Sequence, residues 1–303
     1  MSTLFRIDSF EGYLDIVRNE LPPTSRKYFR GQSKLASDSY PLKPSIGRYT
    51  SLSKLSFFGR ERTEREVLGV FTNHLVTYVR HLPRNDWESL AIAQHHGLPT
   101  RFMDWTTNPL IALYFAARKT NLDDKDQPVD SAVYVLTSEP LRFNEMAQPR
   151  EEEITPIPDW TTTSATPESV WENMGAGFLT DETDEIGSPP QSTFFPPEPV
   201  QARQKRSEAD LPSPFEITEN VIYDPPHVSP RIRAQDGVLL ACHQPLEALD
   251  EKDYIKIVIT SKAHDDIRRR LDQYGVFDKQ LFPDLDGIAK WLKYRVFEID
   301  GKC

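Results

Sequence analysis

Cysteine is nearly absent from the 303-residue sequence, which contains only Cys242 and the last residue, Cys303. Two cysteines do not provide a disulfide framework or a cysteine-rich zinc site. The sequence also has no run of about 20 apolar residues, the length that spans a bilayer as a helix. An acidic residue, Asp8, interrupts the start of the chain before any apolar signal segment. These features predict a cytoplasmic protein with no membrane partner.

Several common catalytic motifs are also missing. The sequence has no Gly-x-Gly-x-x-Gly, no phosphate-binding Gly-Lys-Ser/Thr loop, no His-Glu-x-x-His and no Gly-x-Ser-x-Gly. Ordinary dinucleotide dehydrogenases, nucleoside triphosphatases, zincins and serine hydrolases are therefore disfavoured. His95 and His96 are adjacent, and adjacent helical side chains point about 100° apart, which is poor geometry for sharing one metal ion. We predict no metal site.

The net charge of −10 is not spread evenly along the sequence. Residues 139–220 contain 17 acidic and 5 basic side chains, so the rest of the chain carries a net charge of +2. A near-neutral remainder lacks the broad basic surface that is typical of nucleic-acid-binding proteins. A local basic groove would still allow nucleic acid as a partner.

Residues 139–220 also hold 12 of the 25 prolines and show no hydrophobic periodicity. Such a composition buries too little apolar surface to offset the entropy lost on ordering. We therefore predict a long acidic, Pro-rich insertion that is mostly disordered. Aromatic side chains within it indicate that parts of it dock on the parent domain or on a protein partner. These are Trp160, Trp171, Phe178, Phe194 and Phe195.

Hydrophobic periodicity predicts helices and strands on both sides of this insertion. Before it, helices are expected at 10–17, 61–81, 86–96 and 108–117, strands at 27–31 and 131–137, and a short apolar turn after Pro99. After it, strands are expected at 238–242, 254–260 and 294–299, and helices at 261–275 and 284–292. Asp86 is the expected N-cap of its helix, and Gly97 the residue that ends it.

This order of elements predicts an α+β fold: a single mixed α/β domain with a small central sheet and flanking helices. The expected boundaries are 1–138 for the first part of the domain, 139–220 for the insertion and 221–303 for the second part.

Arg30 is the first candidate site residue, at the end of a short predicted strand. Its neighbour Gly31 allows backbone or a ligand to approach closely. An arginine in that place can bind two oxygens of a phosphate or carboxylate. The alternative is an ordinary ion pair with a carboxylate in the core.

Residues 94–106 contain the densest group of reactive side chains, on a helix end, a turn and a loop. His95 or His96 is either a general acid or base, or a side chain that satisfies the open carbonyls of the helix end. Arg101 and Asp104 form either a simple ion pair or, in a cleft, a cation for phosphate and a carboxylate for a hydroxyl or a developing cation.

A third polar group, at residues 229–237, lies directly before a predicted strand and contains Arg231 and Gln235. It is either part of a site or a turn with solvated arginines. The aromatic residues Trp105 and Tyr114 can stack on a flat ring or fill the core.

Taken together, these three segments resemble the FRG domain family, named for the Phe-Arg-Gly found here at 29–31. The resemblance extends through much of the chain but not into residues 139–220. It is carried by Gln94-His95-His96-Gly97, Pro99-Thr100-Arg101, Asp104-Trp105-Thr106, Asn108-Pro109, Ala112-Leu113-Tyr114-Phe115-Ala116, Arg231, Gln235, Gly237 and Leu281-Phe282-Pro283-Asp284-Leu285.

The order of these motifs is similar to that of ADP-ribosyltransferase folds, which suggests NAD as a ligand by analogy at the level of the fold. The resemblance implies that Arg30 holds a pyrophosphate and that residues 104–106 line the nicotinamide ribose. It also implies that Trp105 or Tyr114 stacks on the nicotinamide. Such enzymes use a glutamate to hold the ribose hydroxyl, and no glutamate here matches it. Asp104 and Gln235 are the substitutes.

The candidate catalytic residues are His95, His96, Asp104 and Gln235. The candidate cofactor-binding residues are Arg30, Gln32, Arg101, Trp105, Thr106, Tyr114 and Arg231.

Two functions of different classes follow from this reading. The first is an enzyme with a nucleotide-type ligand, either an ADP-ribosyltransferase or an NAD glycohydrolase. The second is a non-catalytic module that recognises a phosphorylated or nucleotide ligand, with the insertion as a docking arm for a protein. A role in nucleic-acid processing is a third alternative.

Overall fold

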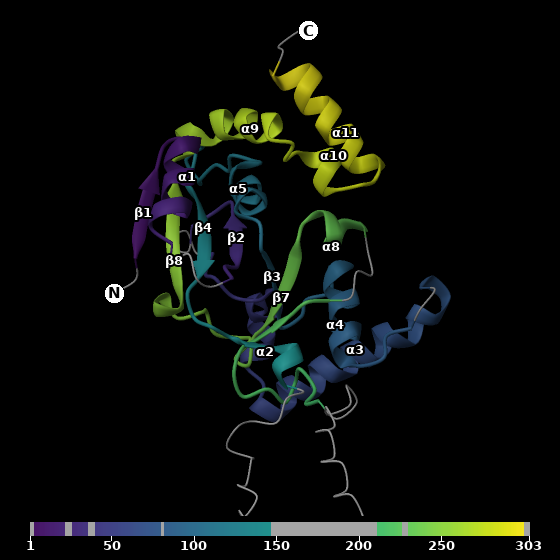
Figure 1. Cartoon of the computed structure of the whole chain (residues 1–303). Helices are drawn as coiled ribbons and strands as arrows, with labels where there is room; N and C mark the ends of the chain where they lie inside the picture. The colour runs from purple at the N-terminus through teal and green to yellow at the C-terminus, as the bar shows by residue number, and fades with distance from the viewer. Residues whose placement is uncertain are drawn as a thin grey trace, which may run out of the picture. The chain divides into compact units, whose positions relative to one another are not determined.

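The computed structural model describes residues 3–21, 26–35, 40–79, 82–146, 211–225 and 230–299. In these residues helices and strands interleave around one mixed sheet (Figure 1), which confirms the predicted mixed α/β fold. None of the helices in these ranges is long and apolar enough to cross a membrane.

The sheet is larger than the small one that the sequence predicts. It has eight strands in the order β1-β8-β4-β2-β3-β7-β6-β5. The β1–β8 and β5–β6 pairs are parallel and the other pairs are antiparallel. The strands are β1 (Leu4–Ile7), β2 (Phe29–Gln32), β3 (Phe102–Thr106), β4 (Ser131–Leu136), β5 (Leu141–Arg142), β6 (Val221–Tyr223), β7 (Gly237–Ala241) and β8 (Tyr254–Ile259).

Helices lie along both halves of the sheet (Figure 1). The α-helices are α1 (Phe10–Asn19), α2 (Thr50–Ser53), α3 (Phe57–Tyr78), α4 (Asp86–His95), α5 (Pro109–Ala117), α6 (Phe143–Met146), α8 (Pro230–Ala234), α9 (His264–Gln273), α10 (Asp278–Leu281) and α11 (Leu285–Lys293). Short 3₁₀ turns occur at Ser45–Arg48, Glu251–Asp253 and Ser261–Ala263, and a π-helix, η8, at Tyr294–Ile299.

Several predicted elements need correction. The N-cap of α4 is Asn85 and not Asp86, because the Asn85 side chain accepts a hydrogen bond from the backbone N–H of Glu88. Residues 102–106 form β3 instead of an apolar turn, and residues 230–234 form a helical turn. Residues 294–299 form a π-helix instead of a strand, since no glycine or proline separates them from α11.

The hydrophobic core has one cluster on one face of the sheet and two clusters on the other. Side chains alternate along each strand. On β4, Tyr134 faces the single cluster on one side of the sheet. Val133 and Val135 face the other side, where they pack in a cluster with the helices α1, α5 and α9. On the same side as these helices, but over β3, β6 and β7, a separate cluster packs under α3 and α4. The two helical clusters therefore leave a boundary between them, near β2 and β3.

Strands β2 and β3 separate at this boundary. In the described residues β2 pairs with β4 through four residue pairs, but with β3 only through Phe29 and Thr106. β3 pairs along its whole length with β7 on its other side, so the sheet continues beyond β3. We call the gap beside the single Phe29–Thr106 pair, where β2 and β3 separate, the seam.

Gly31 allows β2 to pack directly on the backbone of α5. A Cβ atom at this position would lie 1.9 Å from the carbonyl oxygen of Ala112 and 2.7 Å from the backbone nitrogen of Ala116. The close approach that the sequence indicates at Gly31 is therefore made by a helix of the protein itself.

Replacing Gly31 by alanine should destabilise the fold by about 3 kcal/mol, since the backbone of α5 has to move. Gly69→Ala is the matched control, because no atom lies within 4 Å of the corresponding Cβ in the middle of α3. That control should stabilise the protein by about 0.5–1 kcal/mol. Urea unfolding measures both changes, and equal effects of the two substitutions would contradict the close packing at Gly31.

His264 connects α9 to the sheet inside the core. Its side chain is fully buried, with Nδ1 2.9 Å from the Thr120 hydroxyl and Nε2 2.8 Å from the Ser131 hydroxyl. Burial, with a smaller contribution from Arg268, lowers the pKa of His264 below its ordinary value of 6.5. The folded protein therefore holds this ring in its neutral form at pH 7.

Stability should fall as the pH drops below about 6.5. The unfolded chain protonates His264 near that pH, whereas the folded protein resists protonation until the pH reaches its lowered pKa. Denaturant unfolding between pH 8 and pH 5 tests this. We expect His264→Gln to be less stable at pH 7.5 but to lose less further stability on acidification. An identical pH slope for the variant and the native protein would be the contrary result.

The described fold extends into both ends of the predicted insertion. Residues 141–146 form β5 and α6, and Phe215 is buried in the cluster under α3 and α4. The indole nitrogen of Trp87 donates a hydrogen bond to the carbonyl of Pro212. Residues 147–210, with the aromatic side chains that we expect to dock, lie outside the described residues.

Candidate functional site

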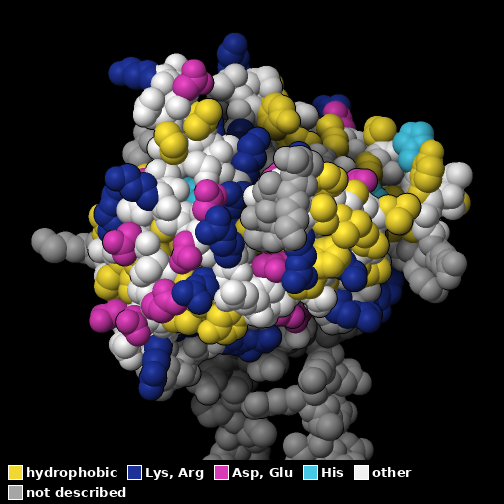
Figure 2. Space-filling view, turned by 90° about the horizontal axis from the view of Figure 1, so that it is seen from above, with side chains coloured by type: hydrophobic (Ala, Val, Ile, Leu, Met, Phe, Trp, Pro, Cys, Tyr) yellow, Lys and Arg dark blue, Asp and Glu magenta, His cyan; other side chains and the backbone are white. Residues whose placement is uncertain are grey.

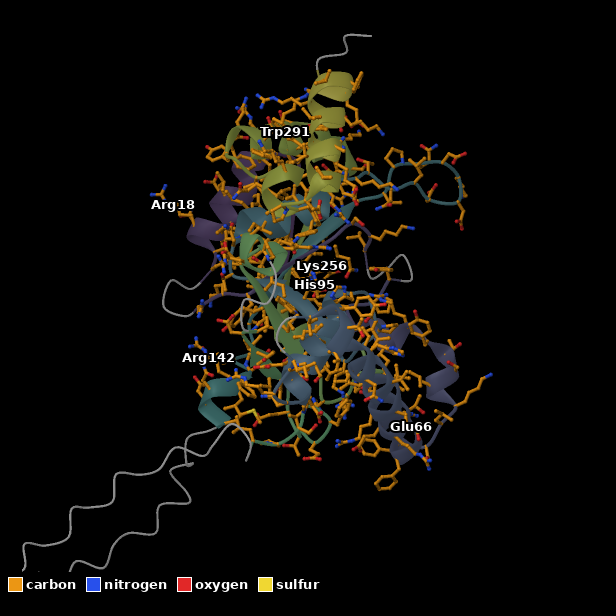
Figure 3. All side chains as sticks on the ribbon, turned by 90° about the vertical axis from the view of Figure 1, so that its right-hand side faces the viewer. Arg18, Glu66, His95, Arg142, Lys256 and Trp291 are labelled. Carbon is orange, nitrogen blue, oxygen red and sulfur yellow. The ribbon has the colours of Figure 1, made fainter. Side chains whose placement is uncertain are left out.

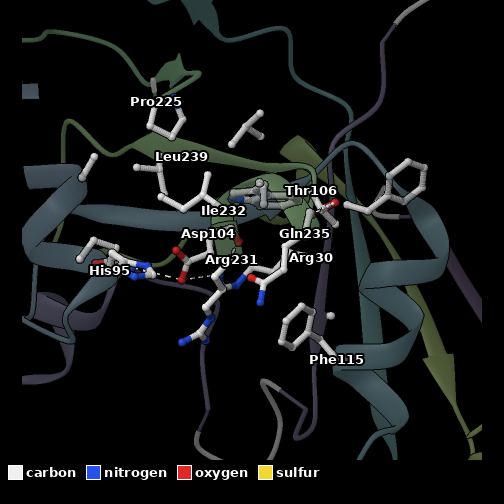
Figure 4. Close-up of a pocket in the computed structure, with 17 residues that line it drawn as sticks. Arg30, His95, Asp104, Thr106, Phe115, Pro225, Arg231, Ile232, Gln235 and Leu239 are labelled. Atoms are coloured by element: carbon white, nitrogen blue, oxygen red, sulfur yellow. Dashed lines mark hydrogen bonds and ion pairs between the residues drawn. The ribbon is translucent and has the colours of Figure 1, made fainter. Parts of the chain in front are cut away.

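A pocket of about 250 Å³ opens at the seam between β2 and β3. It is lined by residues of β2, β3, β7, α4 and α8, together with Phe115 of α5. His95, one of these residues, lies near the middle of the molecule, between the end that carries Trp291 and the end that carries Glu66 (Figure 3). The polar side chains Arg30, His95, Asp104 and Arg231 come together in this pocket (Figure 4).

Arg30 bridges the open seam. Its Nη1 donates a hydrogen bond of 2.5 Å to the backbone carbonyl of Asp104 and lies 3.9 Å from the Asp104 carboxylate. The Nε of Arg30 is buried and has no hydrogen-bond partner among the described residues. A buried donor without a partner costs about 1–3 kcal/mol, so a ligand that accepts this hydrogen bond gains affinity.

One face of α4 brings two polar side chains to the pocket. Ala91, Gln94 and His95 line it, at the i, i+3 and i+4 spacing of a single helix face. The Gln94 carbonyl oxygen accepts a hydrogen bond from the Thr100 hydroxyl, and its amide nitrogen donates one of 3.1 Å to the Asp104 carboxylate. Gln94 therefore holds the carboxylate in place.

The His95 ring has the protonation state that a general base needs. Burial is the main cause of its lowered pKa, and the neighbouring His96 and Arg231 act in the same direction, while Asp104 opposes them. With a pKa below 6.5, most of the His95 population is neutral at pH 7. A neutral imidazole in a pocket can accept a proton from a bound hydroxyl or water.

Asp104 is the only carboxylate among the described residues that line the pocket. Its side chain is 67% exposed even though both neighbours along β3 are buried. Alternation along the strand explains this, because Met103 and Trp105 face the opposite cluster of the core.

The loop after β3 fixes α8 over the pocket. The Thr106 hydroxyl donates to the backbone carbonyl of Gln235, and the backbone N–H of Thr107 donates to the carbonyl of Asp236. Asp236 adopts a left-handed conformation with φ of 44°, which lets the chain turn from α8 into β7. These bonds hold Arg231 near the seam, although residues 230–234 form only a short helical turn.

Arg231 lies over an aromatic ring at the rim of the pocket. Its guanidinium carbon is 4.7 Å from the centre of the Phe282 ring. Phe282 in turn packs edge-on against Phe115, which lines the pocket, at a centroid distance of 6.2 Å. The cation is thus positioned by stacking rather than by an ion pair, and its hydrogen-bond donors stay exposed.

Arg101 is not a ligand-binding residue of this pocket, contrary to the sequence-based expectation. It is buried, and its guanidinium makes two hydrogen bonds to the Glu64 carboxylate, of 2.9 and 3.0 Å, and one to the carbonyl of Pro214. It also does not pair with Asp104. Its donors connect α3, β3 and the segment before β6, so Arg101 is structural.

Replacing Arg101 should therefore lower the free energy of unfolding of the protein in the absence of any ligand. Arg101→Leu leaves the buried Glu64 carboxylate without its partner and should cost about 3–5 kcal/mol in urea unfolding. The control is the exposed pair Arg62–Glu66, where Arg62→Ala should change stability by no more than about 1 kcal/mol. A loss at Arg101 as small as that at Arg62 would contradict the structural role.

Three other predicted residues do not line the pocket. Gln32 is buried and donates to the carbonyls of Lys34 and Tyr40, so it holds a loop and does not line the pocket. His96 is exposed outside the pocket, with its ring edge-on to that of His95. Tyr114 lines a different cavity.

Trp105 touches the pocket but its ring is packed in the core, so it has no free face on which a nicotinamide could stack. Its indole nitrogen is buried and without a hydrogen-bond partner among the described residues. Gln235 and Thr106 line the pocket, and each side chain already makes a hydrogen bond to the protein. The Gln235 amide donates one N–H to the carbonyl of Leu281, and the Thr106 hydroxyl donates as described above.

Sequence reasoning missed Gln94, Phe115 and Ile232 as site residues, although all three line the pocket. For Gln94 a signal was present, because it shares a helix face with His95. Phe115 belongs to one of the motifs that carry the FRG resemblance, whereas Ile232 had no signal, since it reaches the pocket only through packing between distant segments. In the described residues, no group of three or more His, Cys, Asp and Glu side chains is placed to hold a metal ion.

Comparison with known families identifies one match. Residues 25–125 match the FRG domain model. This range includes β2, α4, β3 and α5, and with them Arg30, His95 and Asp104, whereas Arg231 lies outside it. No curated protein and no solved structure matches the chain.

Proposed function

Because the chain contains an FRG domain whose Phe-Arg-Gly segment lines this pocket, we propose that the pocket binds a nucleotide-type ligand through its phosphate groups. The observation that carries the proposal is Arg30, whose buried Nε has no partner in the described residues. Arg30 and Arg231 give the pocket two permanent positive charges, and Asp104 gives it one carboxylate. Such a charge balance favours a phosphate over a neutral ligand.

The size of the pocket supports one nucleotide rather than a whole dinucleotide inside it. At about 250 Å³ it is slightly smaller than the usual range of roughly 300–1,000 Å³ for pockets that enclose drug-sized ligands. A dinucleotide such as NAD would place one half at His95 and extend the other half past Arg231 into solvent.

The chemistry that we propose is cleavage or transfer at the nicotinamide ribose of NAD. Water or an acceptor hydroxyl attacks the anomeric carbon, and the bond to nicotinamide breaks with its electron pair moving to the nicotinamide nitrogen. His95 accepts the proton of the attacking group. Asp104 stabilises the positive charge that develops on the ribose. With water, the products are ADP-ribose, nicotinamide and a proton.

A binding function without turnover is the second candidate, and one observation favours it. The sole carboxylate lining the pocket in the described residues, Asp104, already accepts a hydrogen bond from Gln94 and faces Arg30. A carboxylate neutralised in this way is weaker at stabilising a second positive charge than a free one.

Incubation of the purified protein with NAD separates these functions. We expect nicotinamide release that falls by about 100-fold in His95→Gln and in Asp104→Asn, since each removes one group from the reaction. Binding without release would establish the second candidate. The proposed function is refuted if the protein binds none of NAD, AMP and ADP-ribose and releases no nicotinamide.

The structure provides a matched pair of variants on α8. Arg231→Ala removes a cation that lines the pocket, whereas Arg233→Ala removes one from the same helical turn that does not line it. We expect the first to weaken nucleotide binding about tenfold and the second to leave it unchanged. Equal effects would indicate non-specific attraction of anions.

A further inference from the structure

A second cavity of about 400 Å³ lies at the C-terminal end of α5. No residue that lines it also lines the first pocket. It is formed by the end of α5, by α9, by the residues before α10, and by α11 with η8. On the face of the molecule seen from above Figure 1, Lys and Arg side chains are prominent near the middle (Figure 2).

Basic side chains dominate the wall of this cavity. Five of its lining residues are basic and three are acidic. The basic residues are Arg118, Lys119, Arg268, Lys290 and Lys293. The acidic residues are Asp272, Asp278 and Glu298.

Three of the five cations that line the cavity have no ion pair among the described residues, whereas Arg268 pairs with Asp265 and Lys293 with Glu298. Among the described residues, Arg118, Lys119 and Lys290 form no ion pair with a carboxylate. Two of the acidic residues already have partners. Asp272 accepts a hydrogen bond from the Trp291 indole, and Glu298 lies 3.8 Å from Lys293.

One polar group points to a ligand independently of the charge count. The Nε of Arg268, which lines the cavity, is buried without a hydrogen-bond partner in the described part of the chain. The Tyr114 hydroxyl, which also lines the cavity, is close to Asp278 and Arg118. The Arg268 guanidinium is oriented by hydrogen bonds to the Arg118 carbonyl and to the Asp265 carboxylate, and it lies 5.5 Å from the centre of the Tyr294 ring.

Aromatic side chains lie at both sites. Phe115, which lines the first pocket, packs edge-on against Phe282, and both Arg231 of the first pocket and Lys290 of the second cavity lie near the Phe282 ring, at 4.7 and 5.8 Å. Phe277 and Tyr294 line the second cavity itself, which gives it flat surfaces for a base or another ring.

We propose that this second cavity binds a nucleoside triphosphate, with its phosphates held by Lys119, Lys290 and Arg268. Lys119 follows the end of α5, Lys290 lies on α11, and Arg268, which also pairs with Asp265, lies on α9. These cations line one cavity, and several acceptor oxygens are needed to satisfy their donors. The site is distinct from the pocket beside His95 and does not depend on any reaction there.

Titration calorimetry with ATP in low salt tests the proposal in a protein whose first pocket is weakened by Arg231→Ala. That variant should still bind ATP at one site. Adding Lys119→Ala and Lys290→Ala should weaken this remaining binding by about tenfold or more. Both lysines are exposed, so an unchanged thermal midpoint is expected.

The matched control replaces Lys125 and Lys262, which are exposed and do not line the cavity. Their removal should leave ATP binding unchanged. The proposal is overturned if Arg231→Ala does not bind ATP, or if the two lysine pairs have equal effects. It is also overturned if a single-stranded oligonucleotide binds through Lys119 and Lys290 more tightly than ATP does. Loss of nucleotide binding at the first pocket alone would refute only the function proposed there.

Discussion

The open seam between β2 and β3 is the constraint on which the rest of the site depends. In the described residues these strands meet through a single residue pair, and Arg30 crosses the gap with a hydrogen bond to the backbone of β3. A fully paired sheet would leave no room for a pocket at this place. The seam exists because the two halves of the sheet pack against different groups of helices, with α5 and α9 on one half and α3 and α4 on the other.

The two candidate arginines show how context decides the role of one residue type. Arg101 is buried, and all of its described hydrogen bonds are to acceptors of the protein, namely Glu64 and the carbonyl of Pro214. Arg30 keeps a buried nitrogen without a partner in the described residues and lies at the pocket. The first arrangement stabilises the fold, whereas the second carries a cost that a ligand can offset.

Much of the fold could be predicted because its longer elements carry their own signals. α5 begins with Asn-Pro and continues as an apolar helix, and Gly97 ends α4 with a positive φ. β5 and β6 were not predicted, since strands of two or three residues are too short to show alternation, and β1 at the start of the chain was not predicted either. η8 was predicted as a strand because its apolar residues resemble one, but it continues the turn of α11.

The sequence by itself indicated the FRG domain and the mixed α/β class, and it selected Arg30, His95, Asp104 and Arg231 among its candidates, which the structure brings to one pocket. Only the tertiary structure decided that Arg101 belongs to a buried ion pair and that Tyr114 faces a second cavity. The physical reason is that a residue type and its spacing fix which local element it joins. Whether a charge is paired or left at a cavity depends on elements far away in the sequence, such as Glu64 for Arg101.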